Sequence, residues 1–273
     1  MKRVSLLASG IAIMTMAAAC STGDEPGPGD TPDGGTVPGT DGGDPPTQPP
    51  PPDSGGGGGD DPAMVAACTS MIDYVNMTAN GNGALFDEKI PDVSAFFHAK
   101  SLQVCKILYH DASEVPRRTY LKFVIDDEDG VAYTACGGGD CREMHLSSNY
   151  LRDYSNGGGD LEAEINGVIV HELTHVYQNF DGPGWLIEGM ADFVRFRAGY
   201  IPLSNRHRGG NYDDAYQTTA FFLAWIDDMV PNFGYQMNQR MDESDSADWT
   251  EQVFVDLTDK SVTTLWDQYQ DAL

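Results

Sequence analysis

The sequence predicts an α+β fold that is mostly helical, with a small mixed sheet preceding the helix that carries the most informative motif. Residues 119–125 alternate and are rich in β-branched and aromatic side chains, which predicts a strand. A second short strand is expected at 143–147. Apolar residues at helical spacing predict a series of helices, at 63–77, 92–109, 160–178, 186–197, 213–230 and 261–269.

Local signals support several of these helix ends. Asp160 is a suitable N-cap, and Glu162 and Glu164 are favourable in the first turn that follows it. Residues 182–184, Gly-Pro-Gly, predict a turn before the next helix, and Gly199 is expected to end that helix.

The first 62 residues are predicted to lie outside the folded domain. Residues 1–20 resemble a lipoprotein signal peptide, because two basic residues precede an apolar run that ends in small residues and Cys20. The pattern is similar to a lipobox, in which Cys20 would be lipidated; an ordinary cleaved signal peptide is the alternative. Residues 21–62 are rich in Gly, Pro and Asp and are expected to be a disordered tether.

The remaining residues, 63–273, are long enough for one domain. The chain has 16 Lys and Arg residues against 42 Asp and Glu, a formal net charge of −26 at pH 7. A negative field of this size argues against nucleic acid as a partner. We expect a monomer that is anchored by its lipid to the bacterial cell envelope, with the outer membrane favoured over the inner, or that is secreted.

Four cysteines remain in the domain once Cys20 is assigned to the lipid. An even number in an exported domain suggests two disulfides, with three possible pairings. Cys136 and Cys141 flank a flexible Gly-rich loop and are expected to pair, which leaves Cys68 and Cys105 as the second pair. A four-cysteine metal site is less favoured, because the Cys-x2-Cys spacing typical of structural zinc is absent.

The strongest chemical signal is the sequence His-Glu-Leu-Thr-His at residues 171–175. Residues four positions apart lie on one face of a helix, so the imidazoles of His171 and His175 can reach one metal ion. Glu172 is rotated from them by about 100° and can stand beside the ion as a general base for water. The pattern is typical of a zinc hydrolase, with one Zn²⁺ as the expected cofactor.

A catalytic zinc needs a third protein ligand and an open position. Glu188 is the best candidate, because it interrupts the largely apolar predicted helix at 186–197. Asp192 follows one turn later and could accept a hydrogen bond from a ligand imidazole. Burying either carboxylate without a partner would be costly. The alternative is that both are solvated or paired with Arg195 or Arg197.

With these motifs the chain resembles the plant and bacterial basic secretory protein family of zinc metallopeptidases. The segments that carry the resemblance are 126–134, 171–178, 186–200, 212–223 and 253–268. The resemblance implies a zincin-like fold, with Glu188 as the third ligand and Asp192 as the aspartate that follows it. It also implies that Tyr216 could donate a hydrogen bond to the oxyanion of a tetrahedral intermediate. A core tyrosine is the alternative for Tyr216.

Two features depart from the family pattern. The plant members are basic, whereas this chain is strongly acidic, so the substrate preference need not be shared. The loop between Cys136 and Cys141 is an addition before the second predicted strand. In zincin-like folds an edge strand aligns extended peptide by backbone pairing, and residues 144–147 are the candidate for that strand.

The expected function is zinc-dependent hydrolysis of protein or peptide substrates. Glu172 would take a proton from water and return it to the leaving amine, and Tyr216 would stabilise the oxyanion. The alternative is a surface adhesin or other binding protein that keeps the fold without turnover. A purely structural zinc is disfavoured, because three protein ligands leave the ion open.

Overall fold

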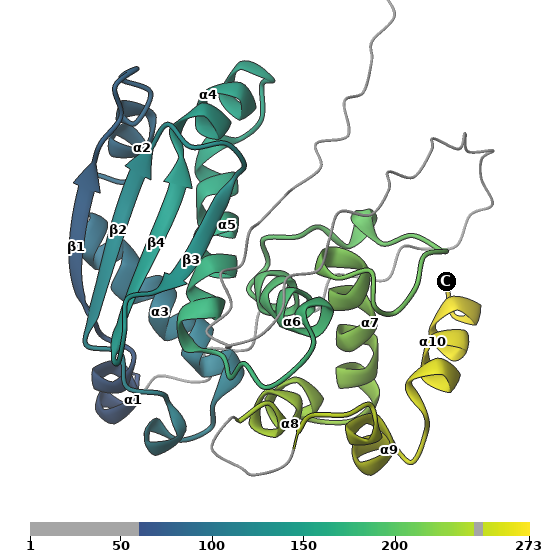
Figure 1. Ribbon diagram of the computed structural model, residues 1–273. Helices are drawn as coiled ribbons and strands as arrows, with labels where there is room; N and C mark the ends of the chain where they lie inside the picture. Colours follow the sequence, from purple (N-terminus) through teal and green to yellow (C-terminus); the bar gives the residue numbers. More distant parts are fainter. Residues whose placement is uncertain (1–59, 243–247) are drawn as a thin grey trace, which may run out of the picture.

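Within residues 60–242 and 248–273, which this computed structural model describes, a four-stranded mixed sheet forms one side of the fold (Figure 1). In spatial order the strands are β1 (Met71–Asn76), β2 (Tyr120–Asp126), β4 (Cys141–Ser147) and β3 (Ala132–Cys136). The first three are parallel, whereas β3 is antiparallel to β4 and forms an edge of the sheet. The predicted α+β class with a small mixed sheet is confirmed.

Two long helices, α3 (Val93–Leu108) and α5 (Leu161–Tyr177), pack against one face of the sheet (Figure 1). Side chains alternate along β2, so Leu121, Phe123 and Ile125 are buried towards these helices. The ring of Phe123 lies 4.7 Å from the ring of Phe97 on α3. This apolar layer holds α3 against the sheet, and α5 packs beside α3 and against β3.

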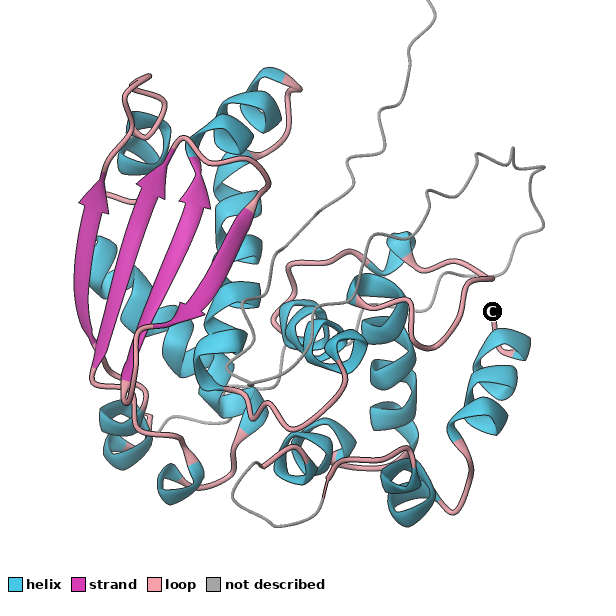
Figure 2. Cartoon of the chain, in the orientation of Figure 1, coloured by secondary structure: helices cyan, strands magenta, loops and turns pink. Residues whose placement is uncertain are grey.

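The other side of the fold is helical (Figure 2). α6 (Gly184–Arg197) packs against both α5 and α7 (Tyr216–Met229), and α8 (Phe233–Arg240) joins them. α9 (Gln252–Thr258) and α10 (Val262–Asp271) complete this side. The shorter helices α1 (Pro62–Ala67), α2 (Ala84–Lys89) and α4 (Ser148–Asn156) lie at the ends of the sheet, and 3₁₀ turns occur at Ala112–Glu114 and Leu203–Asn205.

Several predicted helix ends are confirmed. The side chain of Asp160 accepts a hydrogen bond from the backbone of Ala163 at the start of α5. Gly199 follows α6 with a φ of +88°, which is the conformation that glycine favours at a helix C-terminus. The helix expected to begin at residue 213 begins instead at Tyr216, and no side chain caps its first turn.

Two strands differ from the prediction. The helix expected at 63–77 ends at Ala67, and residues 71–76 form β1. Over so short a stretch the spacing of apolar residues fits a strand as well as a helix. β3 was not predicted, and it displaces residues 144–147 from the edge: that segment belongs to β4, which lies between β2 and β3.

One of the two expected disulfides is present. Cys68, directly after α1, is bonded to Cys105 on α3, and both are buried. The Cys136–Cys141 pairing is wrong, because Cys141 is a free thiol whereas Cys136 is not free. The strand register explains this: Cys136 lies opposite Arg142, so the neighbouring Cys141 points to the other face of the sheet. The observed bond also excludes a four-cysteine metal site.

The proposed signal peptide at 1–20 with Cys20, and the tether as far as residue 59, lie outside the described residues. Within the described part, no helix has both the length and the apolar character needed to cross a bilayer.

Removing the disulfide should destabilise the domain. The two cysteines are 37 residues apart, so the Cys68→Ala/Cys105→Ala double variant should lose about 3–4 kcal/mol of unfolding free energy through a less constrained unfolded chain. Denaturant melts monitored by circular dichroism measure the difference. Cys141→Ala is the control and should melt with the wild type; equal stability of the double variant would contradict the expectation.

Candidate metal centre

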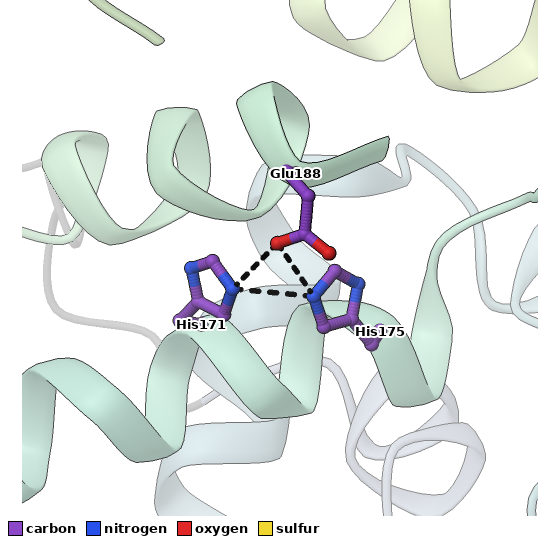
Figure 3. A group of neighbouring side chains, drawn as sticks. All are labelled: His171, His175 and Glu188. Atoms are coloured by element: carbon purple, nitrogen blue, oxygen red, sulfur yellow. Dashed lines mark hydrogen bonds and ion pairs between the residues drawn. The ribbon is translucent and has the colours of Figure 1, made fainter. Parts of the chain in front are cut away.

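Two histidines on α5 turn the same way, towards α6. His171 and His175 lie one helical turn apart, and both are buried. Their Nε2 atoms are 3.2 Å apart, and Figure 3 shows both rings directed at a carboxylate on the facing helix. The local sequence thus places two nitrogen donors on the buried face of one helix.

The facing carboxylate belongs to Glu188 on α6. Its Oε2 atom lies 3.2 Å from His171 Nε2 and 3.5 Å from His175 Nε2 (Figure 3). The turn at 182–184 reverses the chain so that α6 packs on α5. Gly189 permits a close approach on the other side, because a Cβ there would meet the side chain of Thr219 on α7 at 2.3 Å.

These three residues fit a metal ion. The distances between their donor atoms are 3.2, 3.2 and 3.5 Å. Two ligands at about 2.0–2.1 Å from a tetrahedral ion lie about 3.3–3.4 Å apart, which is close to this triangle. In the described part of the chain, Glu188 Oε1 is also buried without a hydrogen-bond partner. The group could therefore hold one ion.

The carboxylates of Asp192 and Glu188 stabilise positive charge on the neighbouring imidazoles. Burial alone lowers the pKa of His171, but Asp192 and Glu188 raise it to about 10. Burial alone raises the pKa of Glu188, but hydrogen bonds from the two imidazoles hold it well below its usual range. A divalent cation would supply the same positive charge at the point where the three donors meet.

The outer nitrogens of both rings have partners. His171 Nδ1 lies 2.8 Å from Asp192 Oδ1, as the sequence predicts. His175 Nδ1 lies 2.9 Å from Nε2 of the Gln178 side chain, a residue that the sequence motifs did not indicate. A metal-bound ring donates from Nδ1, so with an ion present the amide would turn its oxygen, which is buried here without a partner, towards the ring. Such contacts fix the orientation of a ligand ring and direct Nε2 at the ion. The sequence signal for this contact was a polar residue three positions after the second histidine, on the same face of the helix.

The alternative partners, Arg195 and Arg197, do not take the place of His171 as the partner of Asp192. Arg195 lies 3.9 Å from Asp192 and 3.3 Å from Glu164, whereas Arg197 pairs with Asp227 and Asp228 on α7. The shorter contact of Asp192 is therefore with His171. Glu188 is paired with neither arginine.

Glu172 lies beside the three donors and is almost completely buried, at 2 % exposure. Its Oε2 atom accepts a hydrogen bond of 2.8 Å from the hydroxyl of Thr134 on β3. Burial raises the pKa of Glu172, although the two histidines and Thr134 oppose the shift. A carboxylate with a raised pKa is suited to accepting a proton near neutral pH.

Tyr216 lines a small pocket beside His171 and Glu172, with a cavity volume of about 30 Å³. Its ring centroid is 6.1 Å from that of His171. Ala215 and Tyr216 both have positive φ, 64° and 42°, which is uncommon for residues other than glycine. The pocket is lined by Val131, Ala132, Glu164, Val168, His171, Glu172, Asp192, Arg195 and Tyr216. Strain of this kind costs about 1–3 kcal/mol per residue and often marks functional positions.

One known family matches most of the chain. A family described as peptidase of plants and bacteria matches residues 69–269, a range that includes all the site residues described above. This is the family that the sequence motifs resemble. None of the curated proteins and none of the solved structures that were compared matches the chain.

Metal affinity should follow the geometry. With Zn²⁺ as the probe and a chromophoric chelator as competitor, Asp192→Asn should weaken binding about 10- to 100-fold, because it removes the acceptor that orients His171. Glu188→Gln should weaken binding further, because it replaces a charged carboxylate ligand with a neutral amide, which binds zinc more weakly. Glu162→Gln, at an exposed position on α5, is the matched control. Unchanged affinity in Glu188→Gln would contradict the assignment of this site.

Proposed function

The chain belongs to the family of peptidases of plants and bacteria, and we propose that it is a zinc-dependent peptidase acting on protein or peptide substrates. The observation that carries the proposal is the buried triangle of His171, His175 and Glu188 with Glu172 beside it. Two imidazoles and one carboxylate form a donor set typical of catalytic zinc, with the fourth position open for water or substrate.

The residues around the triangle have distinct roles in this proposal. A bound zinc ion would lower the pKa of a water molecule and polarise the scissile carbonyl. Glu172 would accept a proton from the water whose oxygen attacks the carbonyl carbon, and would pass that proton to the amide nitrogen as the C–N bond breaks. Asp192 orients the imidazole of His171 and Gln178 that of His175, so that both Nε2 atoms face the carboxylate of Glu188.

Tyr216 is the proposed donor to the oxyanion. It lines the same pocket as His171 and Glu172, and its strained backbone supports a functional reason for its placement. One well-placed donor of this kind contributes about 2.7–4 kcal/mol to stabilising the transition state.

We further propose a zincin-like arrangement in which β3 aligns the substrate. β3 is an edge strand that packs against α5, so its outer edge can pair with an extended peptide. Lipidation at Cys20 and a tether at 21–62 would hold the peptidase, as a monomer, at the cell envelope, with the outer membrane favoured.

Replacing Glu172 tests the mechanism. Glu172→Gln keeps the size of the side chain but cannot accept the proton, so cleavage of casein or of a peptide library should fall about 10²- to 10⁴-fold. Zinc content, measured in the same sample, should stay at the wild-type level, and Glu162→Gln should cleave normally. Full activity in Glu172→Gln with zinc retained would refute the mechanism; zinc binding without any cleavage by the wild type would indicate a binding protein.

The role of Tyr216 can be separated from that of the metal. Tyr216→Phe removes only the hydroxyl, so kcat should fall about 10²- to 10³-fold with KM and zinc affinity little changed. Tyr212→Phe removes a hydroxyl that hydrogen-bonds to Glu251 and serves as the control. If both variants kept the wild-type kcat, Tyr216 would be a packing residue.

A further inference from the structure

A hydrogen bond connects the edge strand of the sheet to the carboxylate of Glu172. The hydroxyl of Thr134 lies 2.8 Å from Glu172 Oε2 and 3.2 Å from the backbone carbonyl oxygen of the same residue. Both side chains are largely buried, with 9 % exposure for Thr134 and 2 % for Glu172. The bond therefore forms where water competes weakly for either partner.

The sheet register places this hydroxyl. Thr134 lies opposite Met144 of β4, and both are buried. The neighbouring Tyr133 points the other way, where its ring stacks on His145 at 4.5 Å. A shift of one residue in the pairing would turn Thr134 to that outer face. Thr134 is thus held by a rigid element instead of a loop.

A buried carboxylate needs a defined orientation in order to transfer a proton efficiently. Its plane can rotate about the last side-chain bond, and a hydrogen bond to one oxygen fixes that rotation. Thr134 engages Oε2, which leaves Oε1 as the oxygen for proton transfer. The contact with the backbone carbonyl is longer, so the carboxylate is the principal partner.

We propose that Thr134 is a positioning residue that fixes the carboxylate of Glu172 for its role as the general base. This inference rests on the proposed peptidase function, because it assigns a partner to the base of that reaction. The edge strand then has two tasks: its backbone pairs with the substrate, and its Thr134 side chain holds the base. Substrate and base are positioned by the same element.

The test compares variants of Thr134 in the full chain. Thr134→Val removes the hydroxyl with little change in shape, so kcat should fall about 10- to 100-fold while KM and zinc affinity stay within about twofold. Thr134→Ser should restore most of the loss. Thr258→Val, which removes a distant hydroxyl bonded to the carbonyl of Phe254, should leave kcat unchanged. If the valine variant does not fold, Thr134→Ala carries the same expectation.

A second measurement does not depend on turnover. A peptide hydroxamate binds zinc and hydrogen-bonds to the base, so calorimetry should show about 5- to 10-fold weaker binding in Thr134→Val. In a Glu172→Gln background, the same substitution should have no further effect, because its partner is already altered.

The outcomes separate the two claims. Wild-type kcat and hydroxamate affinity in Thr134→Val, or an equal effect in the Glu172→Gln background, would overturn the role of Thr134. Loss of zinc or of stability alone would also overturn it, because it would indicate a structural role. A wild type that binds zinc without cleaving peptides would contradict the proposed function, and hydroxamate affinity would still decide whether Thr134 holds Glu172.

Discussion

The rest of the structure depends on one constraint, the burial of ionisable side chains between α5 and α6. These side chains are His171 and His175 on α5 and Glu188 and Asp192 on α6. Carboxylates and imidazoles are costly to remove from water unless they partner one another or a cation. Glu188 and Asp192 lie on opposite sides of the His171 ring, at 3.2 and 2.8 Å. Close packing makes this arrangement possible: a Cβ at Gly167 would lie 2.8 Å from the guanidinium of Arg195. The site could therefore hold one metal ion among these side chains.

The sheet contributes to this site in two ways. Its inner face packs against α3 and α5, and β3 is the strand that contacts the helix with the histidines. Its edge strand supplies Thr134 and, in our proposal, the backbone that aligns the substrate. The helical side supplies Glu188 and Asp192 from α6 and Tyr216 from the strained start of α7. The candidate site therefore needs side chains from both the sheet and the helical side of the fold.

The sequence predicted the parts of the site whose geometry is local. His171 and His175 share a helix, and Glu188 and Asp192 share the next one after a short turn, so spacing alone indicates which side chains face one another. It failed where long-range pairing decides. Residues 71–76 and 132–136 become strands only through their neighbours, and the register that separates Cys136 from Cys141 is a property of the sheet. Thr134 was missed for the same reason.

The most direct test of the account is to locate the metal. Anomalous diffraction from a zinc-loaded crystal, recorded at the zinc edge, would show where the ion lies. One peak is expected in the domain, about 2.0–2.2 Å from the Nε2 atoms of His171 and His175 and from a carboxylate oxygen of Glu188. A zinc ion bound elsewhere in the domain, or no peak between α5 and α6 in a zinc-loaded and active protein, would contradict the proposed metal site.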